Sequence, residues 1–208
     1  MIEPMSVPGR VDAATLLLSL RPPAWHLRHV RAVAEVAAWL AFRAVGAGHP
    51  VNRAVVEAAA LLHDVDKVLP ADDPFRALHH GAGTAAWLTA RDHGELAAAA
   101  AGHPVTRLAA ADTDAWLDRA SAEEILVAYA DKRAGQRLVS MAGRFADWKR
   151  RYPESAGWHG WSGAQAANVL RRAERVEAMA CALAGVQPDA VRRLPWTARA
   201  FAAARAAE

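Results

Sequence analysis

Imidazole and carboxylate side chains recur along the chain in an order that could hold metal ions. They lie at or near the ends of expected helices or at glycine-rich breaks, and they are His29, the pair His63-Asp64, His80, His103 and Asp131. A metal site in a helical bundle takes one or two ligands from each of several helices. Imidazole nitrogen together with carboxylate oxygen suits Fe, Mn, Co, Ni or Zn better than Ca or Mg. The pattern therefore predicts one or two divalent transition-metal ions.

Asp64 has a particular place in this pattern, because a carboxylate has two oxygens and can bridge two ions. Two ions about 3.5–4 Å apart stabilise both the attacking and the leaving oxygen of a phosphoryl displacement. They also lower the pKa of a bridging water toward neutrality, which gives a hydroxide nucleophile. These residue types therefore favour hydrolysis of a phosphate ester.

Three segments together resemble the HD-domain superfamily of helical, metal-dependent phosphohydrolases. The segments are HVRAVAEVA (29–37), AALLHDVDK (59–67) and AYADK (128–132), and the resemblance covers roughly residues 24–137. It implies an all-α HD-domain bundle. It also implies a first metal ion whose ligands are His29, His63, Asp64 and Asp131.

A second resemblance is narrower. The segment HHGAGTAAWL (79–88) is similar to that of HD proteins which bind a second metal, as the bacterial symmetric diadenosine-tetraphosphate hydrolases do. It implies that His80 and His103 hold the second ion, with Asp64 as the bridge. In such proteins a lysine after the HD pair and an arginine six residues after the closing Asp contact phosphates, and these places are taken by Lys67 and Arg137.

The implied activity is hydrolysis of a nucleotide or dinucleoside polyphosphate by a metal-activated hydroxide. The positions expected to take part in the chemistry are Asp64, Lys67 and Arg137. The alternative is a non-catalytic HD module that senses a nucleotide or binds a protein partner. Whether the enzyme would be a phosphomonoesterase, a phosphodiesterase or a pyrophosphohydrolase is left open by these residues.

Two ligand positions have a neighbouring competitor. His26 lies one turn before His29 on the same expected helix, although the spacing to the apolar residues that follow favours His29. His26 would then support the site from behind or lie on the surface. His79 is followed by a glycine four residues on, whereas His80 directly precedes a glycine, and we favour His80.

Asp66 departs from the family pattern, which has a small residue at this place. A carboxylate here could repel a substrate phosphate, or it could orient Lys67. The segment after Arg137 also departs from the diadenosine-hydrolase pattern. Both departures weaken the assignment of the substrate and leave the assignment of the metal ligands largely unchanged.

Composition sets the class of protein. The 208 residues are 53% hydrophobic, which is enough for a real core and argues against disorder. A single cysteine, Cys181, excludes an intrachain disulfide and a cysteine-based zinc site, and it agrees with a cytoplasmic setting.

The net charge of +3 is small and dispersed, which argues against a nucleic-acid binder. We interpret the basic segment DWKRRYP (147–153) as a solvated helix end. Neither a signal peptide nor a membrane span is expected.

The elements that must position these residues are helices, because helix formers dominate and no long alternating pattern occurs. N-caps are expected at Asn52 and, with capping boxes, at Ser121 and Ser162. The expected helices are 12–20, 24–45, 52–62, 74–93 with a break near HHGAG, 95–102, 121–134, 140–151, 162–185 and 188–206.

The domain organisation follows from a linker. Residues 152–163 are rich in Pro, Gly and Ser, and they separate an HD domain at 1–152 from a C-terminal appendage at 153–208. The appendage adds two helices that pack on the same domain. These helices could also form the contact of a homodimer.

Overall fold

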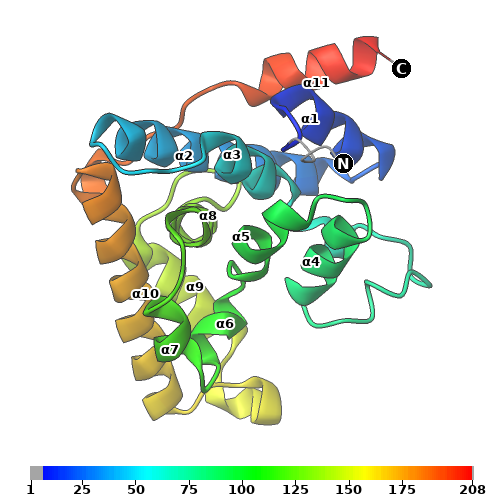
Figure 1. Ribbon diagram of the computed structural model, residues 1–208. Helices are drawn as coiled ribbons and strands as arrows, with labels where there is room; N and C mark the ends of the chain where they lie inside the picture. The colour runs from blue at the N-terminus through cyan, green and yellow to red at the C-terminus, as the bar shows by residue number, and fades with distance from the viewer. Residues whose placement is uncertain (1–6, 208) are drawn as a thin grey trace.

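The computed structural model describes residues 7–207, and of residues 157–159 only the backbone. The described residues form eleven α-helices and four short 3-10 helices and contain no β-strand, which confirms the all-α fold with added C-terminal helices (Figure 1). The α-helices are α1 (Arg10–Ser19), α2 (Ala24–Gly46), α3 (Arg53–Leu62), α4 (Ala82–Thr89), α5 (Ala97–Ala101), α6 (Val105–Ala109), α7 (Thr113–Leu117), α8 (Ala122–Arg133), α9 (Met141–Arg151), α10 (Gly163–Ala184) and α11 (Thr197–Ala206). The 3-10 helices are η1 (Val65–Lys67), η2 (Gly94–Leu96), η3 (Glu154–His159) and η4 (Pro188–Ala190).

Helix α2 is the central element of the core. It packs against α3, α8 and α10, which Figure 1 shows on different sides of it. Much of its buried surface is alanine, including Ala34, Ala37, Ala38 and Ala41. Small side chains let neighbouring backbones approach closely, so the ends of α2, α3, α5 and α8 can bring polar residues to one place.

Several helix starts are confirmed at the residues that the sequence indicates. The side chain of Asn52 accepts hydrogen bonds from the backbone N–H groups of Ala54 and Val55 at the start of α3. Ser121 and Ser162 each form the expected capping box, at the starts of α8 and α10. These caps satisfy backbone donors that would otherwise have no partner inside the helix.

The helix expected over 74–93 is wrong in its first half. Residues 70–80 form turns, and α4 begins only at Ala82. Gly81 has φ +87°, a left-handed conformation that ends any helical path through this point. A Cβ at this position would also lie 2.8 Å from the Pro104 side chain. The chain therefore loops outward from Leu69 and returns at Gly81, as Figure 1 shows to the right of α4.

The last helix is also shorter than expected. Only η4 and α11 form within 188–206, because Pro195 lacks a backbone N–H and disfavours helix at the residue before it. The N–H of Leu194 donates instead to the carbonyl of Glu35, at 2.8 Å. Helices α6 and α7 were not expected from the sequence, because five residues are too few to show a helical period.

The segments after residue 152 pack on the preceding helices. Helix α10 contacts α2 and α8, and α11 lies along α1 (Figure 1). The buried carboxylate of Glu35 on α2 binds the segment that leads into α11. It accepts a hydrogen bond from the Thr197 hydroxyl at 2.5 Å and pairs with Arg193 at 2.8 Å. The C-terminal helices are thus tied to the centre of the core.

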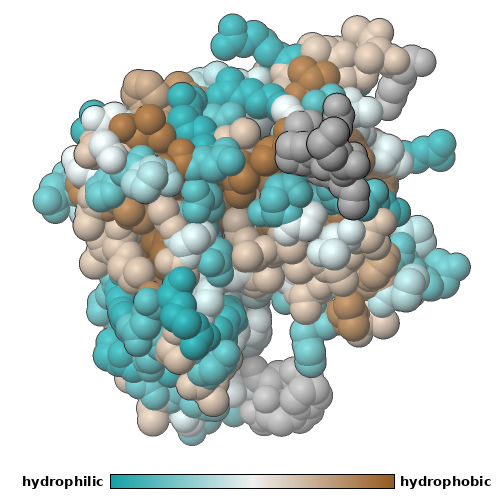
Figure 2. Space-filling model, in the orientation of Figure 1, coloured by the Kyte–Doolittle hydropathy of each residue, from teal (hydrophilic) through white to brown (hydrophobic). Residues whose placement is uncertain are grey.

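Few large hydrophobic side chains are exposed, and three of them belong to α2. They are Val11, Trp25, Phe42, Val45 and Leu78. On the face drawn in Figure 2, hydrophobic residues form small areas among hydrophilic ones. Among the described residues, no helix has the length and hydrophobicity that a membrane span requires.

We expect Glu35→Ala to lower the free energy of unfolding by about 1.5–3 kcal/mol, because it leaves Arg193 and Thr197 without their charged partner. Urea denaturation followed by circular dichroism measures this. Glu174→Ala, at an exposed position of α10, is the control and should shift stability by less than about 0.5 kcal/mol. Equal stabilities of the two variants would contradict the role of Glu35.

Candidate metal centre

Six side chains from five parts of the chain meet at one place. His29 comes from α2, His63 and Asp64 follow the last turn of α3, and Asp131 comes from α8. His80 lies in the turn before α4, and His103 follows α5. The structure therefore brings together all six residues that the sequence proposes as metal ligands. Their role as ligands stays a prediction, which the geometry below supports.

The first half of this cluster consists of His29, His63, Asp64 and Asp131. The Nε2 atom of His29 lies 3.3 Å from Oδ2 of Asp64, 3.3 Å from Oδ1 of Asp131 and 3.3 Å from Nε2 of His63. His63 Nε2 lies 3.6 Å and 3.7 Å from the two carboxylates. His29, His63 and Asp64 are thus close enough to share one metal ion.

The second half consists of Asp64, His80 and His103. Oδ1 of Asp64 lies 3.3 Å from His80 Nε2 and 3.2 Å from His103 Nε2, and the two Nε2 atoms are 3.0 Å apart. These three residues could also hold an ion. Asp64 belongs to both halves, which is the geometry that a bridging carboxylate needs.

The four imidazoles have the same orientation toward the centre, because each Nδ1 lies against an acceptor oxygen. An acceptor cannot donate, so Nδ1 carries the hydrogen and a neutral ring has its lone pair on Nε2. This second contact fixes the tautomer that a metal ligand requires. The Nδ1 partners are the carbonyl of Gly135 for His29 (2.8 Å), the carbonyl of Ala60 for His63 (2.8 Å), the carboxylate of Asp66 for His80 (2.9 Å) and the carbonyl of Ala100 for His103 (2.5 Å).

The two carboxylates stay ionised in this cluster. Burial would raise the pKa of Asp64, but the surrounding imidazoles of His63, His103 and His29 hold it well below its usual range. Burial would likewise raise the pKa of Asp131, and hydrogen bonds from His29 and His63 hold it well below. Two negative charges therefore face four imidazole nitrogens.

The imidazoles respond to these charges in different ways. Burial lowers the pKa of His103 to about 4, which leaves this ring neutral at pH 7. Burial also opposes protonation of His29, but hydrogen bonds to Asp131 and Asp64 outweigh it and raise the pKa of His29 to about 10. His29 thus favours its protonated form between the two carboxylates, and a divalent ion bound there would replace that proton. The donor set fits such an ion, because it offers convergent nitrogen lone pairs and carboxylate oxygens.

The two competing histidines lie outside the cluster. His26 is buried, and its Nε2 lies 3.0 Å from the backbone carbonyl of Asp64, so it supports the HD pair from behind. Burial lowers the pKa of His26 to about 4, and it stays neutral. His79 is exposed on the turn before His80.

Asp66 does neither of the things that the sequence suggests. It is buried and directed at His80, away from the cavity, and the Lys67 ammonium is held by Asp64 at 2.8 Å. Lys67 is 39% exposed, so its charge remains available at the edge of the cluster.

A cavity of about 410 Å³ opens beside the cluster. Its wall opposite the HD pair is built by α9, from Arg144, Trp148 and Arg151, followed by Tyr152. The remaining lining residues are Trp25, His29, Asp64, Lys67, His80, Pro104, Val105, Thr106, Asp131, Gly135 and Gln136. The basic residues at the end of α9 are exposed, as the interpretation of 147–153 as a solvated helix end predicts. The segment also forms part of the site, because Trp148 is buried and Arg151 lines this cavity.

Arg144 and Lys132 are supporting residues that the sequence did not reveal. The Arg144 guanidinium donates hydrogen bonds to three carbonyls at the end of α8, those of Asp131, Lys132 and Ala134. Lys132 is fully buried, and its ammonium donates to the carbonyl of His103 at 3.0 Å. Both contacts join residues distant along the chain, so no local pattern indicates them.

Arg137 lies elsewhere. It is exposed on the turn after α8 and is not among the residues that line the cavity. The phosphate contact that the resemblance implies for Arg137 stays a prediction. Among arginines, Arg144 and Arg151 are better placed to meet a phosphate in this cavity.

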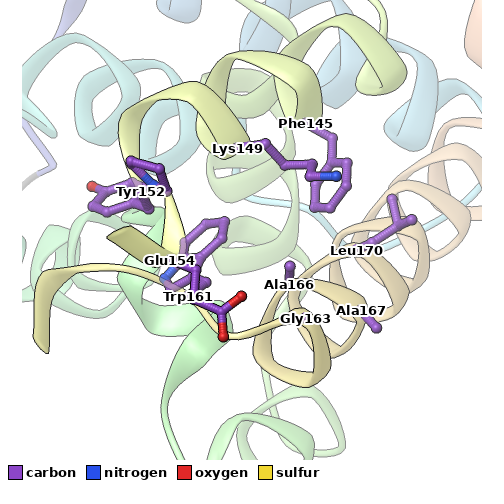
Figure 3. A pocket seen from close by; sticks show the side chains of 10 residues that line it. Phe145, Lys149, Tyr152, Glu154, Trp161, Gly163, Ala166, Ala167 and Leu170 are labelled. Carbon is purple, nitrogen blue, oxygen red and sulfur yellow. The ribbon is translucent and has the colours of Figure 1, made fainter. Parts of the chain in front are cut away.

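A neighbouring hollow of about 380 Å³ lies between α9 and α10. Figure 3 shows Phe145 and Lys149 projecting from α9 and Leu170 from α10. Tyr152 lines both this hollow and the cavity, and its ring stacks on Trp161 with centroids 4.7 Å apart. The stacking holds Tyr152 as a fixed part of the cavity wall.

Comparison with known families gives one match. The family model described as HD domain matches residues 27–135, which is more than half of the chain and contains all six clustered residues. No curated protein and no solved structure matches the chain.

We expect His80→Ala and His79→Ala to differ in metal content. His80 contributes Nε2 to the second half of the cluster, so His80→Ala should retain one Mn²⁺ ion per chain where the wild type retains two. His79→Ala, one residue away and exposed, should retain both. Elemental analysis after dialysis measures the stoichiometry. Loss of an ion from His79→Ala, or from neither variant, would contradict this arrangement.

Proposed function

We propose, from the premise that the chain belongs to the HD domain family, that it is a metal-dependent phosphohydrolase acting on a nucleotide or a dinucleoside polyphosphate. The observation that carries this proposal is the position of Asp64 between two groups of histidines, with Oδ2 close to His29 and Oδ1 close to His80 and His103. A bridging carboxylate of this kind suits a pair of ions at the spacing that phosphoryl transfer uses. The predicted boundary at residue 152 is part of the proposal.

The ligand residues would hold divalent transition-metal ions in place. His29, His63 and Asp131 would bind the first ion, His80 and His103 the second, and Asp64 both. Such ions supply an activated water and neutralise charge on a phosphate. The rings cannot rotate away, because each Nδ1 is hydrogen-bonded.

Cationic side chains around the ions would bind the rest of the phosphate charge. Lys67 is held 2.8 Å from Asp64, so its ammonium stands within reach of a phosphate that contacts the same centre. Arg144 and Arg151 face the cavity from α9. Preorganised positive groups of this kind stabilise the charge that develops in the transition state. Arg137 would join them only at the rim.

The shape and lining of the cavity support a nucleotide as substrate. Beyond the cationic residues, the lining contains three aromatic side chains, Trp25, Trp148 and Tyr152. Trp25 is 47% exposed, so one of its surfaces is free for a planar group. Aromatic faces bind nucleobases by stacking. A phosphate at the histidine cluster and a base on an aromatic wall would satisfy both ends of a nucleotide.

We expect the purified protein, loaded with Mn²⁺, Fe²⁺ or Co²⁺, to hydrolyse at least one member of a panel of nucleotides and dinucleoside polyphosphates. Asp64→Ala should abolish turnover, because it removes the residue shared by both halves of the cluster. Asp72→Ala, at an exposed position, should keep full activity. Release of phosphate or nucleotide is measured by chromatography. A metal-loaded protein that binds a nucleotide without hydrolysing it would contradict the enzyme and support a nucleotide sensor.

We expect Lys67→Ala to lower kcat/KM by about 10²-fold, the usual effect of removing one electrostatic contact to the reacting group. Its metal content should stay unchanged, because Lys67 is not a ligand. Lys149→Ala is the matched control, since Lys149 lines the neighbouring hollow and not the cavity. Steady-state kinetics on the substrate found by the panel measure both. Equal kcat/KM values for the two variants would remove Lys67 from the proposed chemistry.

A further inference from the structure

Asp66 makes an unusual set of contacts for a residue beside a metal cluster. It is only 6% exposed, and both oxygens of its carboxylate lie near Nδ1 of His80, at 2.9 Å and 3.1 Å. The same carboxylate accepts a hydrogen bond from the N–H of Gly81 at 2.8 Å. Its own N–H donates to the Thr84 hydroxyl at 3.3 Å. Asp66 is therefore bonded to two residues of the turn that leads into α4, His80 and Gly81, and to Thr84 in the first turn of that helix.

His80 differs from the other three imidazoles of the cluster in two respects. Its Nδ1 partner is a carboxylate, whereas those of His29, His63 and His103 are backbone carbonyls. Its side chain is also the most exposed, at 33%, compared with 16%, 0% and 1% for the others. Among the four imidazoles, His80 is therefore the least buried, and it is the one whose Nδ1 partner carries a negative charge.

The packing around Asp66 fixes the turn as well as the ring. A Cβ placed on Gly83 would lie 2.3 Å from the Phe75 carbonyl and 3.1 Å from the Cβ of Asp66, so the start of α4 is pressed against both. The Asp66 carboxylate lies at the N-terminus of this helix, where a negative charge is favourable. Because it binds the turn and the ring together, the position of His80 relative to Asp64 depends on Asp66.

We propose that Asp66 is a positioning residue for the second metal ion, which holds His80 with Nε2 directed at Asp64 and sets the affinity of that half of the centre. This inference rests on the metal centre of the proposed function. A carboxylate behind a ligating imidazole fixes its orientation and strengthens it as a ligand, and removing such a partner usually costs about 10–100-fold in metal affinity. The first ion should be indifferent to Asp66, because Asp66 contacts neither His29, His63 nor Asp131 in the structure.

The test compares Asp66→Ala and Asp66→Asn with the wild type by Mn²⁺ titration, using equilibrium dialysis and electron paramagnetic resonance. In Asp66→Ala we expect the second ion to bind about 10–100-fold more weakly, with the affinity for the first unchanged. The resonance signal of a coupled ion pair should give way to that of an isolated ion. Asp66→Asn should be intermediate, because an amide oxygen in the place of Oδ2 can still accept from His80 and Gly81 but lacks the negative charge that strengthens the imidazole as a ligand.

Asp72→Ala is the matched control, since this acidic residue belongs to the same loop and is exposed. It should bind both ions as the wild type does. Unchanged binding of the first ion by both Asp66 variants shows that the fold is intact, and the milder Asn variant measures the effect if the Ala variant does not fold. A second ion bound equally tightly by wild type and both Asp66 variants would overturn the role of Asp66 and leave the metal centre standing. A wild type that binds only one ion, or none, would overturn the second half of the centre together with this role.

Discussion

The convergence of two ionised carboxylates and four inward-facing imidazole nitrogens on one place is the constraint on which the rest of the structure depends. Each Nδ1 is already bonded to an acceptor, so the Nε2 atoms cannot all satisfy one another. Without a cation, negative charge and lone pairs would repel, and the carboxylates of Asp131 and Asp64 raise the pKa of His29 against the effect of burial. A cluster built this way is costly unless it binds something positive.

The polar residues of the cluster and the carbonyls that orient them lie mostly at the ends of helices. The HD pair follows α3 directly, His103 follows α5, and the Gly135 carbonyl that orients His29 follows α8. Alanine-rich packing around α2 keeps these ends within reach of one another. Fully buried supports complete the arrangement, with His26 behind Asp64 and Lys132 behind His103. The hydrophobic core thus serves to hold polar groups in unfavourable proximity.

The sequence predicts those parts of this arrangement that have a local signature. Ser121, Ser162 and Asn52 mark helix starts because a cap acts on residues two or three positions away, and the same holds for the apolar run before His63. The sequence predicts a break near HHGAG, but not that all of 70–80 forms turns, because the path of the chain there depends on the left-handed Gly81 and its contact with Pro104.

The parts of the site that the sequence does not indicate are contacts between residues far apart along the chain. The partner of Asp66 lies 14 residues away, and the carbonyls bound by Arg144 lie 10–13 residues away on another helix. The basic residues of 147–153 are exposed as the sequence predicts, whereas the place of Trp148 and Tyr152 in the cavity wall depends on residues from other helices. Contacts made across the fold are decided by the whole chain.

Helix α9 extends the site beyond the residues that match the HD domain. The match to the HD domain ends at residue 135, yet Arg144 closes the end of α8 and the next two turns of α9 form one side of the cavity. The six clustered side chains and this side of the cavity therefore come from different stretches of the chain. Substitutions in the last two turns of α9 would reshape this side of the cavity and leave the six clustered side chains unchanged.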